Sequence, residues 1–288
     1  MPAQPTLCET IYWHENGFRR LAYTAWGDPA APPVLCVHGL TRTGRDFDTL
    51  AAALADRFHV LCPDLPGRGG SDWLPDPLLY QPPTYIAALT NLLALFARPV
   101  AWVGTSLGGI CGMLAAAAPG APIERLVLND IGPFLPEAAL QRIGDYVGAA
   151  PYFADIEKAE AWLRHVHAPF GKLTDAQWRH LAETSVRALP QGGYTLHYDP
   201  AIAVPMRATP PRDLDMWPIW DRIDLPMLVL RGAESDLLLP DTFARMATKA
   251  RSHTVSECGH APALMDAATI AVVRDFLLAG LRPRWATV

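Results

Sequence analysis

The stretch VGTSLGGICG, residues 103–112, joins an apolar run to a glycine-rich helical segment. The apolar run is continuous, as in a strand that is buried on both faces of a sheet. The helical segment begins near residue 107, so the chain must turn sharply at Ser106. Gly104 and Gly108 leave room for the strand and the helix to approach each other at such a turn. The pentapeptide matches G-x-S-x-G, in which the serine projects above the carboxyl edge of a sheet.

Strand-like and helical stretches alternate on both sides of this turn. This order is typical of α/β proteins, in which crossover helices join parallel strands. The predicted strands are 18–27, 33–39, 58–64, 99–104, 123–130, 226–231 and 252–257, and the predicted helices are 46–57, 83–97, 107–119, 240–250 and 262–279. We therefore predict an α/β fold with a mainly parallel central sheet and helices on both faces.

The alternation stops between Pro133 and Asp215, where strands vanish and the sequence becomes helical and aromatic. This middle segment has apolar positions of its own, which favours an inserted subdomain over a linker. A single sheet with one insertion explains the order of elements better than two independent domains. We assign residues 1–132 and 216–288 to the core and residues 133–215 to an inserted helical cap.

Composition limits the classes of partner. The chain has 288 residues, half of them hydrophobic, and a formal net charge of −5 without a basic stripe, so we expect no nucleic-acid partner. The start has no basic and apolar leader pattern, and no run of about 18 apolar residues occurs, so we expect no membrane association and a cytoplasmic protein. The five cysteines form no C-x-x-C pair. We expect a monomer or homodimer with a small-molecule substrate, no metal and no cofactor.

The turn at Ser106 can be chemically active only with partners, because a serine hydroxyl is a poor nucleophile without a base and an acid that orients the base. His260, in ECGHAPAL, is the predicted base, since it lies in the loop between the last strand and the final helix. Asp236, in LRGAESDLLLP, is the predicted acid, because it follows a strand and completes the expected chain order. Asp130, in LVLNDIGP, also follows a strand at this edge and is the alternative acid.

Two backbone N–H groups are predicted to form an oxyanion hole. Leu107 directly follows the serine, and Leu40 lies in VHGLTRTG after the strand 33–39. His38 in the same loop is expected to be a structural hydrogen-bonding residue. A phosphate-binding turn is the alternative for the glycine-rich stretch, but no lysine follows the glycines.

Substrate selection is expected between the sheet edge and the cap. Aromatic and apolar side chains favour a hydrophobic acyl or alcohol group there. Arg42 is considered for a substrate carboxylate, with a solvated surface arginine as the alternative. The remaining candidates are Phe134, Tyr146, Tyr152, Trp162, Trp178, Tyr194 and Met206, of which about a third should face the pocket and the rest pack the cap.

Five ordered motifs resemble the α/β-hydrolase family. They are HGL (38–40), PDLPGRGGSD (63–72), GTSLGG (104–109), LRGAESDLLLP (230–240) and GHAP (259–262). The resemblance implies an α/β-hydrolase fold, with Ser106 as nucleophile, His260 as base, Asp236 as acid and Leu40 and Leu107 as oxyanion donors. It also implies that PGRGGSD is a structural loop. Because the turn carries a serine, relatives with an aspartate nucleophile are disfavoured.

The expected activity is that of a serine hydrolase acting on carboxylic esters of small to medium hydrophobic substrates through an acyl-enzyme. A lactonase or a carbon–carbon bond hydrolase would use the same triad, and an acyltransferase or perhydrolase would differ in the acceptor that replaces water. A ligand-binding receptor with little turnover is the alternative outside enzymes. The residue pattern does not separate these reactions.

Overall fold

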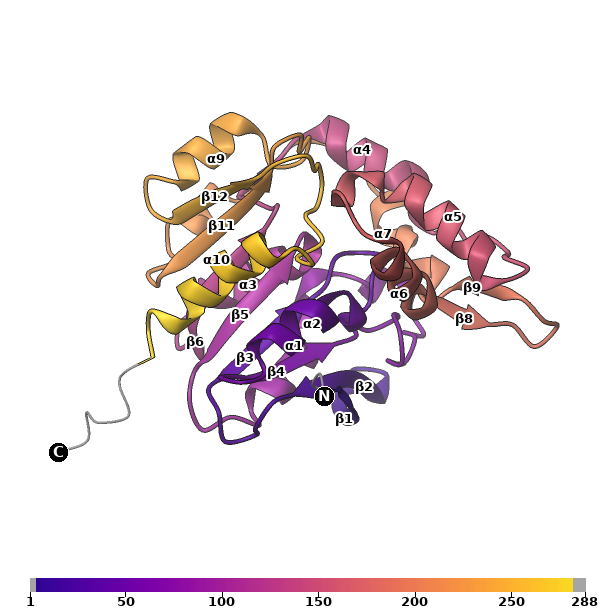
Figure 1. The fold of residues 1–288 in the computed structure, drawn as a ribbon, viewed down its shortest axis with the longest axis horizontal. Helices are drawn as coiled ribbons and strands as arrows, with labels where there is room; N and C mark the ends of the chain where they lie inside the picture. The colour runs from indigo at the N-terminus through magenta and orange to yellow at the C-terminus, as the bar shows by residue number, and fades with distance from the viewer. Residues whose placement is uncertain (1–3, 282–288) are drawn as a thin grey trace.

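The computed structural model describes residues 4–281, which are organised around an eight-stranded sheet (Figure 1). Its strand order is β1 (Thr6–His14), β2 (Gly17–Trp26), β4 (His59–Pro63), β3 (Pro33–Val37), β5 (Val100–Thr105), β6 (Ile123–Asn129), β11 (Met227–Gly232) and β12 (Arg251–Val255). Of these eight strands, β2 runs against the rest, pairing antiparallel with β1 and β4, while the other neighbours pair in parallel. The prediction of a mainly parallel sheet is confirmed.

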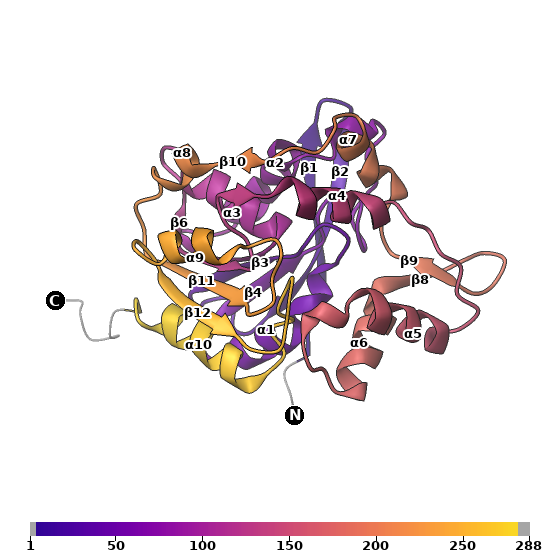
Figure 2. The ribbon, with the colours of Figure 1, turned by 90° about the horizontal axis from the view of Figure 1, so that it is seen from above.

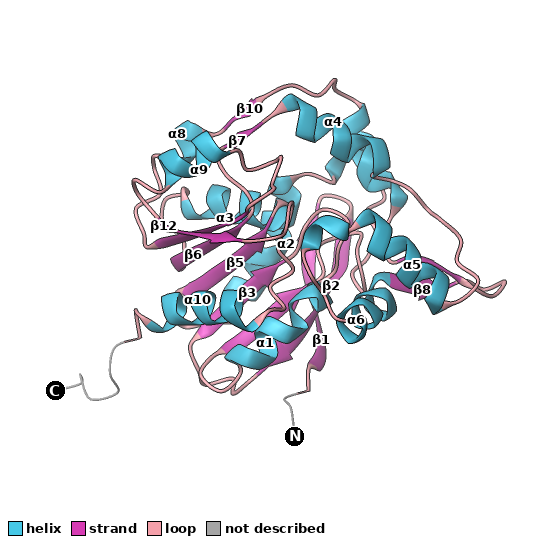
Figure 3. Cartoon of the chain, turned by 45° about the horizontal axis from the view of Figure 1, so that its top comes forward, coloured by secondary structure: helices cyan, strands magenta, loops and turns pink. Residues whose placement is uncertain are grey.

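Helices cover both faces of this sheet, as predicted (Figure 3). On one face α1 (Asp48–Leu54) and α10 (Ala267–Leu278) cover Val34 and Cys36, and on the other α2 (Pro82–Leu93) and α3 (Leu107–Ala116) cover Leu35 and Val37. All four side chains are fully buried. Because successive strand residues point to opposite faces and both faces are covered, β3 has the continuous apolar run that marked it in the sequence.

The remaining core elements are short. They are the 3₁₀ helices η1 (Gly44–Phe47) and η2 (Pro77–Leu79) and the helices α8 (Trp217–Trp220) and α9 (Pro240–Met246). Within residues 4–281 no helix is both long and apolar enough to cross a membrane.

The middle segment lies to one side of the central sheet (Figures 1 and 2). Its elements are β7 (Phe134–Leu135), α4 (Glu137–Tyr146), α5 (Ile156–Val166), η3 (Ala168–Phe170), α6 (Asp175–Ser185), β8 (Val186–Ala188), β9 (Tyr194–Leu196), η4 (Pro200–Ala203), α7 (Val204–Arg207) and β10 (Leu214–Asp215). The prediction that strands vanish here is wrong, since β8 pairs with β9 and β7 with β10. These strands have two or three residues, too few for a period of two to stand out in the sequence.

Strand β1 was not predicted. It pairs along its whole length with β2, but its outward side chains Leu7, Ile11 and Trp13 are apolar and more than 60% exposed. A half-buried strand is recognised by alternation of apolar and polar residues, and apolar residues on the solvent face remove that alternation. The tight connection from His14 to Gly17 is the local signal that remains.

The junction of β5 and α3 is tightly packed at two glycines. A Cβ atom at Gly104 would overlap the carbonyl of Gly108, and a Cβ atom at Gly108 would overlap the carbonyl of Val37. The first turn of α3 therefore lies directly against the ends of β3 and β5. This close approach explains why the sequence needs both glycines around Ser106.

We expect Gly104→Ala to lower the free energy of unfolding by about 1–3 kcal/mol, because the added methyl group meets a backbone carbonyl that cannot move independently. The control is Gly144→Ala in α4, where a Cβ atom meets no atom within 4 Å and alanine should stabilise the helix by up to about 1 kcal/mol. Urea unfolding of both variants measures the difference. Equal stability of the two variants would contradict the packing account.

Candidate active site

Ser106 lies at the turn between β5 and α3 with an unusual backbone conformation. Its φ of 51° and ψ of −114° place it in the left-handed half of φ/ψ space, which non-glycine residues rarely occupy. Both backbone polar groups of Ser106 form hydrogen bonds that hold the turn. The N–H of Ser106 donates to the carbonyl of Asn129, and its carbonyl accepts from the N–H groups of Gly109 and Ile110. The structure thus contains the strained serine turn that the pentapeptide predicted.

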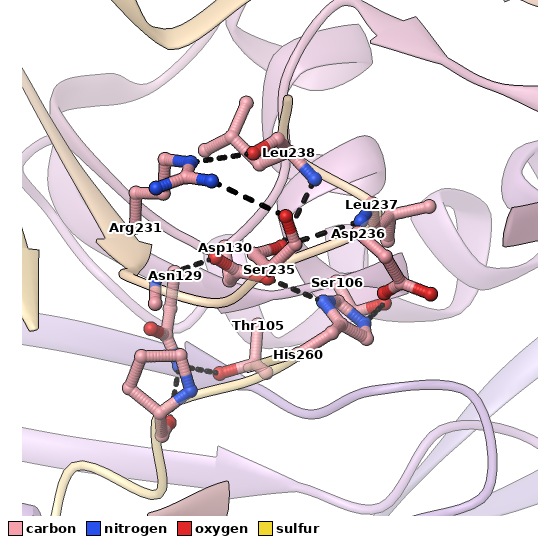
Figure 4. A network of polar contacts seen from close by, with 12 residues as sticks. Thr105, Ser106, Asn129, Asp130, Arg231, Ser235, Asp236, Leu237, Leu238 and His260 are labelled. Atoms are coloured by element: carbon pink, nitrogen blue, oxygen red, sulfur yellow. Dashed lines mark hydrogen bonds and ion pairs between the residues drawn. The ribbon is translucent and has the colours of Figure 1, made fainter. Parts of the chain in front are cut away.

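Ser106, His260 and Asp130 form a chain of hydrogen bonds (Figure 4). The distance from Ser106 Oγ to His260 Nε2 is 2.9 Å, and that from His260 Nδ1 to Asp130 Oδ2 is 2.7 Å. A carboxylate only accepts hydrogen bonds, so Nδ1 of the neutral imidazole carries the proton and Nε2 accepts from the serine hydroxyl. This tautomer is the one in which the imidazole can take a proton from Ser106.

Asp130 is fully buried, no lysine or arginine among residues 4–281 forms an ion pair with it, and three groups donate to its carboxylate. Oδ1 accepts from the N–H of Gly232, and Oδ2 accepts from Ser235 Oγ at 2.6 Å as well as from His260. The donors come from the end of β11, the loop after it and the loop before α10. Burial of a carboxylate is costly unless it is hydrogen-bonded, so these donors hold the site together.

The prediction that Asp236 pairs with His260 is wrong. The Asp236 side chain is 50% exposed and forms a two-point ion pair with Arg142 of α4, with Nε to Oδ2 at 2.6 Å and Nη2 to Oδ1 at 2.9 Å. Sheet register explains why Asp130 takes the place instead. Thr105 is opposite Asn129 in the β5–β6 pair, so Ser106 and Asp130 follow side by side at the same edge.

A hydrogen bond from His38 to the carbonyl of Gly39 fixes the orientation of the peptide unit between Gly39 and Leu40. His38 Nε2 accepts from the N–H of Leu65 at 2.9 Å, so its Nδ1–H is free to donate to the carbonyl of Gly39 at 2.6 Å. In a trans peptide the N–H points away from the carbonyl, so this contact directs the N–H of Leu40 the opposite way. Leu40 and Leu107 both line the cavity that holds Ser106.

Arg68 supports the same loop from the other side of Leu40. Its Nε donates to the carbonyl of Leu40 at 2.9 Å, and its Nη1 donates to Tyr85 Oη at 2.9 Å. The guanidinium is fully buried and stacks within 6 Å of the rings of Tyr80 and Tyr85. The PGRGGSD loop therefore contributes structure, as the family resemblance implied, and its arginine fixes the predicted oxyanion loop.

A cavity of about 320 Å³ opens onto Ser106 and His260. Most side chains on its wall are aliphatic or aromatic, including Leu40, Ile110 and Leu237 from the core. The middle segment supplies the facing wall, with residues from α4, η3 and the η4–α7 stretch. This lining suits an apolar substrate of modest size.

The predicted pocket residues divide into two groups. Arg42, Tyr146 and Met206 line the cavity, whereas Phe134, Tyr152, Trp162, Trp178 and Tyr194 do not. Trp162 packs against Phe153 within the middle segment, and Trp178 packs against Leu181 of α6 and Met265 of the core, so both have packing roles. The division depends on how the middle segment packs over the sheet edge, which no local sequence pattern encodes.

Arg42 is neither a solvated arginine nor a free cation. It is 6% exposed and forms a two-point ion pair with Asp46, and its Nη1 is 3.3 Å from His167 Nε2. An arginine only donates, so Nε2 of His167 accepts. Burial and the charge of Arg42 hold the pKa of His167 well below its usual value, which keeps the imidazole neutral.

Sequence reasoning missed the residues that position this network. Ser235 donates to Asp130, and Arg231 holds the loop by donating to the carbonyls of Leu238 and Ser235 (Figure 4). Asn129 donates to Thr105 Oγ1 and to the carbonyl of Pro262. Each of them lies within three residues of the end of β6 or β11, which was the available signal, but polar residues near strand ends occur in most α/β proteins.

Known proteins resemble the chain over nearly its whole length. A sequence profile of the alpha/beta hydrolase family matches residues 34–273. The 3-hydroxybutyrate-oligomer hydrolase of Cupriavidus necator is 44% identical, and the alignment covers 96% of this chain and 99% of that protein. Among solved structures, an alpha/beta hydrolase from Novosphingobium aromaticivorans has a TM-score of 0.86 at 37% identity, covering 96% and 99% of the two chains. A putative hydrolase from Rickettsia typhi has a TM-score of 0.88 at 30% identity, covering 96% and 100%.

The buried His38 leads to a pH prediction. Burial lowers the pKa of His38 to about 3 in the folded protein, whereas the unfolded imidazole keeps its usual value of about 6.5. Between these values the unfolded chain binds the extra proton, so folding stability falls as pH falls. We expect the stability advantage of the wild type over His38→Gln to shrink by up to about 1.4 kcal/mol per pH unit below pH 6.5.

Urea titrations at several pH values between 7 and 4 measure this difference. The matched control is His180→Gln, because the stability contribution of His180 changes with pH in the opposite direction. A hydrogen bond to Asp48 raises the pKa of His180, so its contribution is fully present below the unfolded pKa and is lost as pH rises through the folded pKa. A stability difference for His38→Gln that does not change with pH would contradict a neutral His38 in the folded state.

Proposed function

The chain belongs to the alpha/beta hydrolase family and is a carboxylic ester hydrolase, and from this premise we propose that Ser106, His260 and Asp130 are its catalytic triad. The observation that carries the proposal is the unbroken hydrogen-bonded chain of these three side chains at the floor of an apolar cavity. We assign the oxyanion hole to the backbone N–H groups of Leu40 and Leu107.

In the first half of the proposed reaction, Ser106 Oγ attacks the ester carbonyl carbon while its proton moves to His260 Nε2. The carbonyl oxygen becomes an oxyanion, which accepts from the N–H groups of Leu40 and Leu107. Each such donor contributes about 3–4 kcal/mol to stabilisation of the transition state. The buried carboxylate of Asp130 stabilises the imidazolium through Nδ1.

In the second half, His260 returns the proton to the alkoxy oxygen, the carbon–oxygen bond of the ester breaks and the alcohol leaves. Water then takes the place of the alcohol. It gives one proton to His260 and attacks the acyl-enzyme, and collapse of the second tetrahedral intermediate releases the acid and returns the proton to Ser106. The net reaction adds one water across one ester bond.

We propose linear oligomers of short hydroxyalkanoic acids, such as 3-hydroxybutyrate, as the substrate class. The support is the name of the 44% identical relative together with a cavity that is mostly apolar and of modest volume. A chain of methyl-substituted ester units presents alternating apolar and carbonyl groups, which such a wall can accept. We propose that residues 133–215 act as a cap, since they supply one side of this cavity.

The assignment of Ser106 predicts loss of at least about 10⁴-fold in kcat/KM for p-nitrophenyl butyrate in Ser106→Ala, because the covalent route is removed. A fluorophosphonate probe should label the wild type and not the variant. The same pair of proteins tests the substrate class, since the wild type should release monomer from linear 3-hydroxybutyrate dimer and trimer. Turnover of the nitrophenyl ester without release from either oligomer would contradict the substrate class alone.

The assignment of the acid predicts that Asp130→Asn loses about 10⁴-fold in kcat, because the amide favours the wrong tautomer of His260. Asp236→Asn is the matched control at the predicted position that the structure does not support. It should lose less than about tenfold, since it removes only a half-exposed ion pair. Steady-state kinetics with p-nitrophenyl butyrate decides, and the reverse ranking would return the role to Asp236.

A further inference from the structure

The wall of the Ser106 cavity has charge of one sign. Among the described residues that line it, two are arginines, Arg42 and Arg142, and none is an aspartate or glutamate. Their acidic partners, Asp46 and Asp236, do not line this cavity. A mostly apolar wall whose only charged side chains are arginines favours a substrate that carries a negative group.

The two arginines differ in how deeply their side chains are buried. Arg42 has Nε and Nη2 on Asp46 and Nη1 near His167, and its side chain is 7% exposed. Arg142 has Nε and Nη2 on Asp236, the Tyr146 hydroxyl lies beside its guanidinium, and its side chain is 45% exposed. The Nη1 group of Arg142 therefore has no carboxylate partner within residues 4–281. Of the two cations, Arg142 is the more accessible.

From this arrangement we propose that Arg142 binds the free carboxylate of the substrate, an inference that rests on the proposed class of hydroxyacid oligomers. A linear hydroxyacid oligomer has a hydroxyl group at one end and a carboxylate at the other. At every ester bond the hydroxyl end is on the acyl side and the carboxylate is on the alcohol side. Arg142 consequently holds the fragment that leaves first, while the hydroxyl-ended fragment forms the ester with Ser106.

Asp236 positions Arg142 in this proposal. The two-point pair fixes the plane of the guanidinium, so less conformational freedom is lost when a carboxylate binds. The pair also joins α4 of the middle segment to the loop after β11, the same loop in which Ser235 donates to Asp130. The cation is thereby held at a defined place relative to the triad.

Binding at Arg142 makes a free acid end a determinant of specificity. A charge-assisted contact to an arginine at a partly exposed site changes kcat/KM by about 10-fold, and by up to about 100-fold if the site is dry when occupied. The wild type should therefore prefer the linear 3-hydroxybutyrate dimer with a free carboxylate over its methyl ester. Raising the salt concentration should reduce this preference, since the attraction is screened.

The experiment measures kcat/KM for the dimer and for its methyl ester, with cleavage of the internal ester followed by chromatography. The readout is the ratio of the two values within each protein, so a change in the amount of folded enzyme cancels. We expect a ratio of about 10 or more in the wild type, a ratio near 1 in Arg142→Gln and an intermediate ratio in Arg142→Lys, which keeps the charge without the planar fork.

The matched control is Arg179→Gln. Arg179 is a cap arginine of α6 that pairs with Glu157 and Glu160 and does not line the cavity, so the variant should keep the wild-type ratio. A wild-type ratio near 1, or an unchanged ratio in Arg142→Gln, would overturn the inference and leave the ester hydrolysis standing. Hydrolysis of p-nitrophenyl butyrate without cleavage of either dimer form would overturn the substrate class and this inference with it.

Discussion

The buried carboxylate of Asp130 is the interaction around which the site is organised. It has no exposed surface, and its negative charge is stabilised by hydrogen bonds from the Gly232 N–H, Ser235 Oγ and His260 Nδ1. An unpaired buried charge would cost several kcal/mol, so the elements that supply these donors must meet at one place. The ends of β6 and β11 and the loop before α10 are joined there, and His260 is aimed at Ser106.

A second set of contacts prepares the opposite side of the site. His38 and Arg68 hold the carbonyls on either side of the Leu40 N–H, and neither side chain has an acidic hydrogen-bond partner in the described structure. Both are buried, and their hydrogen bonds to oxygen go to backbone carbonyls and, from Arg68, to the Tyr85 hydroxyl. Preorganised donors of this kind cost no reorganisation when negative charge develops on a substrate oxygen. The core thus contains Ser106, His260 and Asp130, and the middle segment supplies the wall of the cavity that faces them.

Much of the fold could be predicted from the sequence because its signals are local. Continuous apolar runs such as 33–39 reflect burial on both faces, and the glycines around Ser106 reflect one close approach of backbone to backbone. Strand β1 was not predicted because its solvent-facing side contains the apolar residues Leu7, Ile11 and Trp13. The short strands of the middle segment were not predicted because an alternation of apolar and polar residues cannot be recognised over only two or three residues.

The sequence by itself determined the α/β core, the turn at Ser106 and the choice of His260, because each depends on spacing between neighbouring residues or on one loop. Only the tertiary structure decided between Asp130 and Asp236, since both follow strands that end at the same edge. The parallel β5–β6 register sets Asp130 beside Ser106, while the loop after β11 turns Asp236 toward Arg142. That choice depends on the lateral order of strands and on a contact between residues 94 positions apart, which no local pattern encodes.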